Sequence, residues 1–275
     1  MKYFLFLFIS INSFASIRYD QISFLTTHNS FNYSKRSSLK PYGPRGYLFP
    51  NQNFPINDQL KFGVRALMLD LYKKNGEVIL CHGGRACGLL GKDRAELVFK
   101  DIGRFLENHP KEIITLILES YIGTKDLENV LIKAGLFKLL FSKNSNEEWP
   151  SVQRMISTNK RLVILNDRIE TMNPSWNHDL WAHAVETPFS YKKMEDLKCE
   201  FNRGNPKNSL FIFNHFTTLI SGRPLEAKKI NRKEFLEKRV DDCRKKLGKF
   251  PNFITVDFYF WGDSLEVVNK INYLK

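Results

Sequence analysis

Residues 113–118 read Ile-Ile-Thr-Leu-Ile-Leu and are followed directly by the acidic Glu119. The stretch is almost continuous in apolar and β-branched residues and does not alternate apolar with polar ones. Such a run is typical of a strand that is covered on both faces, as the strands of parallel sheets are. It therefore predicts a buried strand of an α/β fold, with a carboxylate at its carboxyl end.

Seven further runs of this kind occur along the chain, separated by amphipathic segments. The eight predicted strands are Ile22–Thr26, Val64–Leu71, Val78–Cys81, Ile113–Leu118, Leu162–Leu165, Trp181–Val185, Leu210–Phe213 and Phe253–Val256. Eight strands favour a closed barrel, so we expect an irregular TIM (β/α)8 barrel. The irregularity lies between the second and third strands, where the link is too short for a helix and Asn75-Gly76 predicts a turn.

Helical spacing and helix-ending residues appear between several of these strands. Residues 95–108 place apolar side chains on one stripe, and Pro110 stops that helix. Two further helices are predicted over 124–135 and 231–246, the second ending before Gly248.

The chain length and the first residues indicate one exported domain. A chain of 275 residues is long enough for a single α/β barrel with a substantial core. A basic start, an apolar run at 3–11 and small residues around Ala15 form the pattern of a secretory signal peptide. We therefore expect a signal peptide at 1–16 and a secreted or periplasmic barrel domain at 17–275. No later apolar stretch reaches the ~20 residues that a membrane-spanning helix needs.

Four cysteines in a chain expected to be exported predict two disulfides. Their positions suggest that Cys81 pairs with Cys87 and that Cys199 pairs with Cys243. Neither pair has the spacing of a zinc site.

Polar residues stand at or just beyond the carboxyl ends of the predicted strands, where the active sites of α/β barrels are built. They are His28, Asn29, Asp70, His82, Glu119, Asn166, Glu186, Asn214 and Asp257. Each one alone has an ordinary explanation, since Asn and Asp commonly serve turns and caps. Their convergence on one mouth of the barrel predicts a functional site there.

Three segments match, in order and spacing, the X region of phosphatidylinositol-specific phospholipases C: residues 26–30, 59–70 and 81–83. Further stretches resemble the broader PLC-like phosphodiesterases of plants, fungi and bacteria, among them 105–110, 159–163 and 251–259. The resemblance covers about residues 20–272, and its motifs are specific in combination. It implies a single barrel of the PLC-like phosphodiesterase type.

This resemblance implies a phosphoric diester hydrolase or lyase of the phospholipase C type, acting through a cyclic phosphate. A hydroxyl beside the phosphodiester attacks phosphorus, so one group takes its proton and another protonates the departing alcohol. Histidines suit both tasks near neutral pH. By resemblance His28 is the general base and His82 the general acid, while Asp257 is the carboxylate that orients the first histidine.

Relatives offset the negative charge of the transition state either with calcium or with an arginine. Met68 and Asp70 are two residues apart on one strand, so both point into the barrel, at the positions that are Glu and Asp in the calcium enzymes. The resemblance thus implies a divalent cation, Ca²⁺ or Mg²⁺, held by Asn29, Asp70 and Glu119, with water in place of the carboxylate lost at Met68. The alternative is a metal-free mechanism in which Arg85 supplies the charge.

Headgroup contacts are expected from Arg85, Glu186, Asn214 and Tyr259. The inositol-binding lysine and arginine of bacterial relatives have no convincing counterparts in this chain. The expected substrate is therefore a phospholipid or a related phosphodiester, and phosphatidylinositol itself stays open.

The formal net charge of +13 fits attraction to anionic lipid or nucleic acid, steering of a phosphorylated substrate, or an ordinary solvated surface. With the resemblance, we expect peripheral membrane contact, no nucleic-acid partner and a monomer. Two other functions stay open. One is a glycerophosphodiester-cleaving or phospholipase D-like enzyme, against which Met68 argues, and the other is a non-catalytic secreted barrel that binds anionic lipid.

Overall fold

The computed structural model describes residues 17–34, 49–82, 87, 91–144, 146–171, 173–218 and 222–273. Its strands are β1 (Phe24–Thr27), β2 (Ala66–Lys74), β3 (Glu77–Leu80), β4 (Asp93–Arg94), β5 (Ile114–Ser120), β6 (Leu162–Asn166), β7 (Asn177–Asp179), β8 (Ala184–Glu186), β9 (Leu210–His215) and β10 (Phe253–Val256). Its α-helices are α1 (Ile56–Phe62), α2 (Ala95–Asn108), α3 (Thr124–Lys133), α4 (Val152–Ser157), α5 (Leu180–His183), α6 (Pro224–Ile230), α7 (Lys233–Leu247) and α8 (Ser264–Tyr273). Short 3₁₀ turns lie at Tyr19–Gln21, Phe137–Leu139 and Met194–Asp196.

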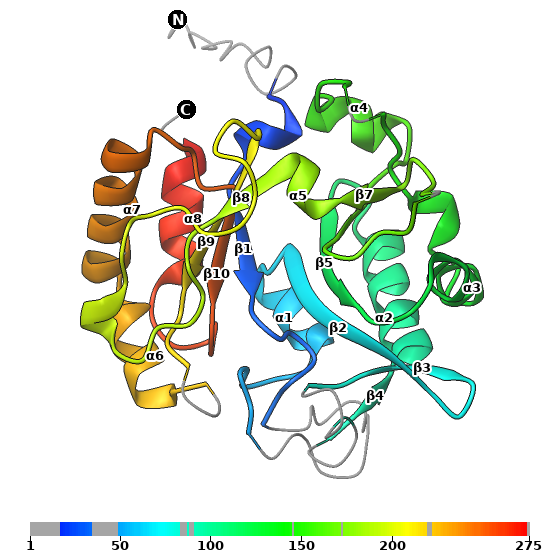
Figure 1. Ribbon diagram of the computed structural model, residues 1–275, viewed down its shortest axis with the longest axis horizontal. Helices are drawn as coiled ribbons and strands as arrows, with labels where there is room; N and C mark the ends of the chain where they lie inside the picture. The colour runs from blue at the N-terminus through cyan, green and yellow to red at the C-terminus, as the bar shows by residue number, and fades with distance from the viewer. Residues whose placement is uncertain are drawn as a thin grey trace, which may run out of the picture.

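Eight parallel strands form one curled sheet in the order β7-β6-β5-β2-β1-β10-β9-β8. Figure 1 shows this curled sheet with α2 and α3 on one side of it and α7 and α8 on the other. In the described part of the chain no ladder joins β7 to β8, and the short α5 connects them along the chain. The predicted α/β barrel in a single domain is confirmed, with one seam left open.

The third predicted strand, Val78–Cys81, is present as β3, but its place in the barrel is wrong, because β3 is not part of the parallel sheet. It pairs antiparallel with β2, with Leu71 opposite Leu80. The turn between them has positive φ at Asn75 (51°) and Gly76 (78°), which is the two-residue hairpin geometry that Asn-Gly favours. This turn was predicted correctly, and the hairpin brings the residue after Cys81 back to the level of Asp70.

The eighth parallel strand is instead β7, whose sequence Asn177-His178-Asp179 carries no apolar run. The predicted strand Trp181–Val185 is likewise only partly correct. Its first half is α5, where the side chain of Asp179 accepts a hydrogen bond from the backbone N–H of Trp181, and β8 begins at Ala184. An N-cap of this kind starts a helix even in a short apolar segment.

The alternation along the central strands decides which side chains reach the inside of the barrel. Ala66, with Met68 packed against it, and Ile117 belong to the inner apolar cluster, while Leu67 and Leu69 belong to the outer cluster beneath the helices. Side chains two apart on a strand share a face. The strand ends at positions 70 and 119 therefore project inward, as the sequence predicts for position 70.

The helices follow the predicted boundaries closely. The helix α2 spans Ala95–Asn108, and α7 ends at Leu247 because Gly248 adopts the left-handed conformation at φ 64°. In the described residues, no helix is both long enough and apolar enough to cross a membrane.

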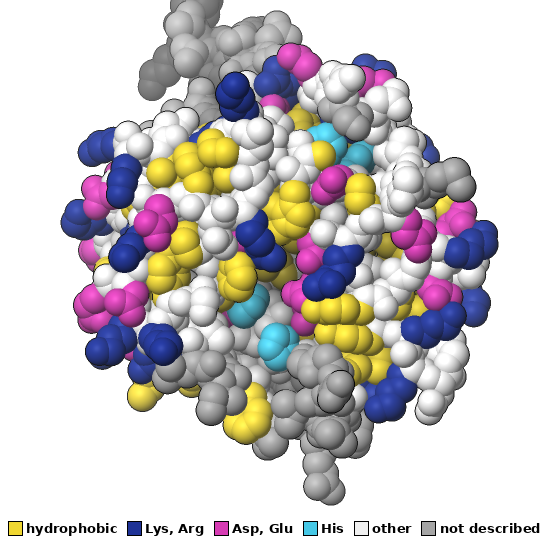
Figure 2. Space-filling model, in the orientation of Figure 1, with side chains coloured by type: hydrophobic (Ala, Val, Ile, Leu, Met, Phe, Trp, Pro, Cys, Tyr) yellow, Lys and Arg dark blue, Asp and Glu magenta, His cyan; other side chains and the backbone are white. Residues whose placement is uncertain are grey.

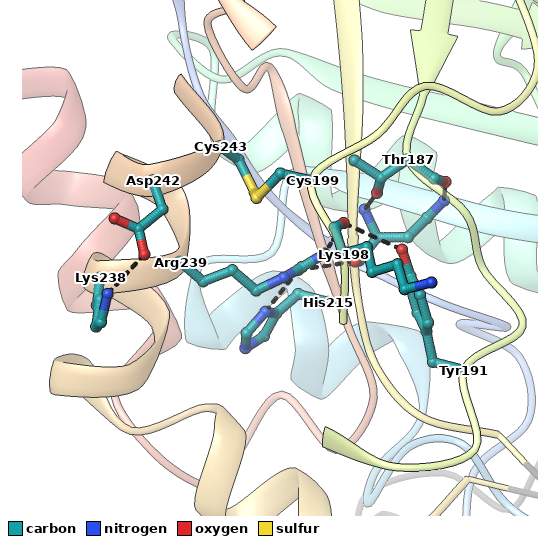
Figure 3. Close-up of a disulfide and its surroundings, with 10 residues drawn as sticks. Thr187, Tyr191, Lys198, Cys199, His215, Lys238, Arg239, Asp242 and Cys243 are labelled. Atoms are coloured by element: carbon teal, nitrogen blue, oxygen red, sulfur yellow. Dashed lines mark hydrogen bonds and ion pairs between the residues drawn. A yellow bond between two sulfur atoms is a disulfide. The ribbon is translucent and has the colours of Figure 1, made fainter. Parts of the chain in front are cut away.

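Both predicted disulfides, Cys81–Cys87 and Cys199–Cys243, are confirmed. The second ties the loop after β8 to α7 (Figure 3). One turn earlier on α7, Arg239 donates to the backbone oxygen of Lys198 and to the ring of His215. The loop that precedes β9 is therefore fastened to α7 by a covalent bond and by a buried guanidinium.

Candidate active site

A pocket of about 490 Å³ opens at the carboxyl ends of the parallel strands. Its wall includes both strand-end histidines and several carboxylates, together with the apolar Ile117, Trp181 and Phe189. Figure 2 shows histidine, acidic and basic side chains gathered around this central hollow, with hydrophobic side chains beside them. Such a mixed, concave site at the carboxyl end of a barrel is the expected place for chemistry.

His28 follows β1 directly and is fixed by the neighbouring strand β10. Its Nδ1 lies 2.9 Å from Oδ1 of the buried Asp257, and its ring stacks on Phe216 with centroids 4.0 Å apart. Burial raises the pKa of Asp257, while His28 and a hydrogen bond from Asn51 oppose that rise. A proton on Nδ1 donated to this carboxylate leaves Nε2 as the ring's free acceptor.

His82 follows the β2–β3 hairpin and is held by the second strand-end carboxylate. Its Nδ1 lies 3.1 Å from Oδ2 of Asp70, whose side chain is buried. The hydrogen bond that His82 donates to Asp70 is the main cause that raises the pKa of His82, against the effect of burial. Burial in turn raises the pKa of Asp70, and the charge of Glu119 adds to it.

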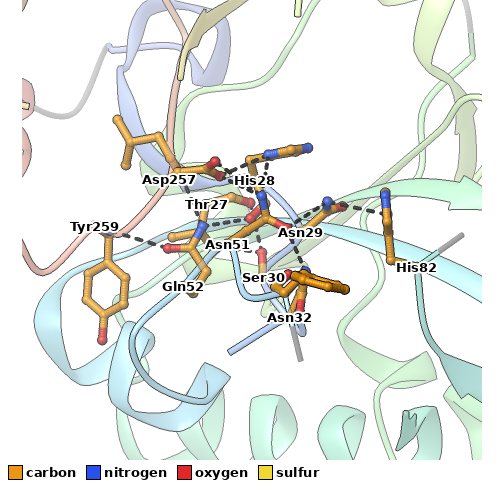
Figure 4. Close-up of polar contacts among 12 residues, drawn as sticks. Thr27, His28, Asn29, Ser30, Asn32, Asn51, Gln52, His82, Asp257 and Tyr259 are labelled. Carbon is orange, nitrogen blue, oxygen red and sulfur yellow. Dashed lines mark hydrogen bonds and ion pairs between the residues drawn. The ribbon is translucent and has the colours of Figure 1, made fainter. Parts of the chain in front are cut away.

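A row of amide side chains connects the two histidines (Figure 4). Asn51 donates through Nδ2 to both carboxylate oxygens of Asp257 at 3.2 and 3.1 Å, and its Oδ1 accepts from Asn29 at 3.1 Å. The Nδ2 atom of Asn29 in turn lies 3.4 Å from Nδ1 of His82. Sequence reasoning missed Asn51, and the length of the polar sequence stretch 34–53 in which it stands is the signal that could have found it.

The carboxylates expected to hold a cation line one side of the pocket. Asp70 and Glu119 are direct neighbours in the β2–β5 ladder, and Asn29 stands beside His82. Asp167, which was not predicted, lines the same side, and burial together with the charge of Glu119 raises its pKa to about 6. Amide and carboxylate oxygens that repel one another suit a hard cation. Within the described residues, however, no three His, Cys, Asp or Glu side chains form a ready-made metal cluster.

Of the residues predicted to contact the headgroup, two line the pocket and Tyr259 does not. Glu186 and Asn214 line the pocket, but they bond to each other at 3.1 Å, and the other oxygen of Glu186 is held by Arg203 at 2.6 Å. Glu186 and Asn214 therefore form part of the pocket wall, where their polar groups bond to protein side chains. Arg203 itself was missed, because it lies in a loop with no motif.

Tyr259 lies in the core, where its ring packs edge-on against Phe62 with centroids 5.0 Å apart, and it does not line the pocket. Figure 4 shows its ring directed away from His28 and His82. The positive φ of Phe258, 48°, turns the chain directly after Asp257. The structure therefore places Tyr259 where it cannot contact a headgroup in this pocket. Arg85 lies outside the described residues.

Solved structures of two bacterial proteins have a similar fold. The fold is similar to the phosphatidylinositol-specific phospholipase C of Listeria monocytogenes, with a TM-score of 0.62 and 15% identity over 94% of this chain and 95% of that one. The enzyme of the same name from Staphylococcus aureus also gives a TM-score of 0.62, at 13% identity over 95% of both chains. At these identities the likeness concerns the fold alone.

Sequence comparisons agree with the structural ones. A PI-PLC X domain-containing protein of Arabidopsis thaliana is 29% identical over 92% of this chain, which spans 62% of that relative's length. The PI-PLC X domain-containing protein 1 of Arthroderma benhamiae is 26% identical over 93% of this chain and 86% of its own length. The family described as PI-PLC X 1 matches residues 14–272. The chain therefore belongs to the PI-PLC X family.

Proposed function

We propose that this protein is a secreted phosphodiesterase of the phospholipase C type, with His28 as general base and His82 as general acid. The observation that carries the proposal is the pair of histidines in one pocket, each with its Nδ1 against its own buried carboxylate. A merely structural histidine has no need of an oriented carboxylate beside an open pocket.

In the proposed first step, a substrate hydroxyl next to the phosphodiester forms a new bond to phosphorus. Its proton passes to Nε2 of His28, and Asp257 stabilises the imidazolium that results. The bond from phosphorus to the departing alcohol breaks, and His82 gives its proton to that oxygen. The products are a cyclic phosphate and a free alcohol. Water opens the cyclic phosphate with the two histidines in exchanged roles.

A divalent cation completes the proposal. Asn29, Asp70 and Glu119 would hold it, and it would supply positive charge beside the phosphate. Arg168 lies 3.8 Å from Glu119 and 3.7 Å from Asp167. A divalent cation would offset the negative charge that Asp70 and Glu119 still place beside a phosphate. We expect exhaustive EDTA treatment and dialysis to abolish most turnover and added Ca²⁺ to restore it. Turnover that is unchanged after this treatment would rule out the cation.

A lipid substrate is supported by exposed apolar side chains at the carboxyl-terminal end of the sheet. Six exposed large hydrophobic side chains stand on the segments that follow the strand ends: Phe49, Tyr121, Ile169, Phe189, Leu225 and Phe260. Phe49 and Phe189 line the pocket itself, and exposed apolar side chains at a pocket suit contact with a lipid surface. Two disulfides and a relative named as a secreted protein, 22% identical over 94% of this chain, support export.

Phosphorus NMR tests the reaction directly. Wild type, His28→Ala and His82→Ala are incubated with a panel of phosphodiesters, and the products are identified by their shifts. We expect wild type to release a cyclic phosphate and both variants to lose that product. His109→Ala is the matched control, since His109 is an exposed histidine outside the pocket. An absence of turnover on every substrate would favour the non-catalytic lipid-binding barrel instead.

A further inference from the structure

Arg203 lines the pocket but has no part in the proposed acid–base chemistry. It lies in the loop between β8 and β9, and its Nε donates to Oε1 of Glu186 at 2.6 Å. The guanidinium also lies 4.5 Å from the ring centroid of Trp181 and 4.5 Å from that of Phe189. One hydrogen bond and two aromatic faces therefore fix the plane and the direction of this cation.

The backbone of Arg203 is locked to the end of β8. The backbone N–H of Glu186 donates to the oxygen of Arg203 at 3.0 Å, and that of Asn202 donates to the oxygen of Glu186 at 2.9 Å. Gly204 follows at φ +86°, where a Cβ atom would lie 2.1 Å from the backbone oxygen of Ala184. Only glycine permits this close approach. The guanidinium is thus held in place before any ligand arrives, which lowers the cost of binding one.

The terminal amino groups of this guanidinium are available to a ligand. Across the part of the chain that the structure describes, its hydrogen bonding is confined to Nε and Glu186. Asp167 lines the same pocket and feels the charge of Arg203, yet no ion pair joins the two. A headgroup in the pocket therefore meets a fixed donor at Arg203 and an acceptor at Asp167.

We propose that Arg203 selects the headgroup: its terminal amino groups donate to oxygen acceptors of the headgroup, and its guanidinium covers the aromatic faces that an ammonium headgroup would need. Ammonium recognition needs open aromatic faces. Here the guanidinium already covers Trp181 and Phe189. The acceptor oxygens belong to hydroxyl groups or to a phosphate. This inference rests on the proposed phosphodiesterase function and adds a specificity residue to it.

Binding without turnover tests the selection separately from catalysis. The whole protein is titrated by calorimetry with inositol 1-phosphate, inorganic phosphate and phosphocholine. We expect wild type to prefer inositol 1-phosphate to phosphocholine, and Arg203→Ala to weaken inositol 1-phosphate roughly tenfold to hundredfold and phosphocholine less, so that the preference narrows. An equal loss for inorganic phosphate would assign the contact to phosphate oxygens, and a smaller loss would assign it to hydroxyls.

Two further variants separate selection from folding. Arg94→Ala removes an arginine of similar exposure that does not line the pocket and that pairs with Glu77 at 3.2 Å. This variant should bind all three ligands with unchanged affinity. The double variant Glu186→Gln with Arg203→Gln removes both charges together, so that no buried carboxylate loses its cation, and should show the same loss as Arg203→Ala.

An unchanged preference for inositol 1-phosphate over phosphocholine in either Arg203 variant would overturn the selection, and would leave Arg203 as the counter-charge of Glu186 alone. Arg203-dependent binding in a protein that cleaves no phosphodiester would refute the proposed function and keep the selection. Cleavage with the same headgroup preference in wild type and variant would support the proposed function and refute the selection by Arg203.

Discussion

The two candidate catalytic histidines have contrasting surroundings. The side chain of His28 is 19% exposed, and it is held by Asp257 and by stacking on Phe216 inside the parallel sheet. The side chain of His82 is 53% exposed and follows a hairpin that lies outside that sheet. One histidine is fixed by the barrel itself, and the other is brought to the barrel by an added hairpin.

This difference fits the two proposed roles. A general base must present one nitrogen to one hydroxyl, so its tautomer and ring plane have to be fixed. A general acid must reach a leaving group that varies with the substrate and must exchange protons with water. We therefore expect turnover to depend more steeply on the support of His28 than on that of His82.

The largest expected effect is that of Asp257→Asn. An amide no longer favours the proton on Nδ1 of His28, and it stabilises no imidazolium. We expect kcat to fall roughly 10³- to 10⁴-fold with a small change in KM, measured on a soluble phosphodiester. Asp126→Asn, which alters a half-buried carboxylate paired with Lys73 outside the pocket, should leave kcat unchanged. A fall of less than tenfold at Asp257 would contradict the proposed role.

A smaller effect is expected at Asn51, which contacts both Asp257 beside His28 and Asn29 beside His82. Asn51→Ala removes two hydrogen bonds to Asp257 and the acceptor of Asn29. We expect kcat to fall roughly tenfold to hundredfold, because the carboxylate and the amide row lose their orientation. The exposed Asn269→Ala on α8 is the control. If KM rose and kcat stayed constant, Asn51 would bind substrate and would not position the base.

The contrast between the surroundings of His28 and those of His82 also explains which parts of the site the sequence could predict. His28 and Asp257 follow apolar runs that are visible in the sequence, and parallel strands bring such ends to one edge. His82 was placed at the same mouth as the end of a barrel strand, but β3 is not one, and the hairpin after β2 brings His82 to the pocket instead. Asn51 and Arg203 lie in loops, whose paths depend on long-range contacts that no local pattern records. Tyr259 was assigned to the pocket because the turn at Phe258 leaves no signal in the sequence.

The two disulfides are expected to differ in their effects on turnover and on stability. Cys81 directly precedes His82, and its bridge to Cys87 closes a separation of 6 residues, against 44 for Cys199–Cys243. Loop-closure entropy gives about 2 kcal/mol of stability to the first and about 4 kcal/mol to the second. We expect Cys81→Ser with Cys87→Ser to lower kcat about tenfold while costing less stability than Cys199→Ser with Cys243→Ser. Denaturant unfolding and kinetics of the two double variants test this order, and equal kcat in wild type and the first variant would contradict it.

The last expected effect concerns stability and not turnover. His215 is buried on β9 and pairs in register with Val256 of β10. Its Nε2 donates to the backbone oxygen of Ile230, and its Nδ1 accepts from Arg239, each at 2.9 Å. A guanidinium only donates, so the neutral ring fits and the protonated ring does not. Burial, aided by the charge of Arg239, lowers the pKa of His215 to about 3.

The sign of the pH effect follows from that lowered pKa. Between pH 6.5 and about 3 the unfolded chain binds the proton and the folded chain does not, so stability falls as the pH falls through this window. Moving from pH 7 to pH 5 should cost about 2 kcal/mol through this group. His215→Gln, which does not titrate, should shrink the difference in unfolding free energy between pH 7 and pH 5 by that amount, whereas the exposed His109→Gln should not. His178 and His183, whose pKa values burial lowers to about 3 and about 4, remain in the variant and retain part of the acid sensitivity. If His215→Gln showed the full wild-type difference in unfolding free energy between pH 7 and pH 5, the ring of His215 would not be held neutral by burial and by Arg239.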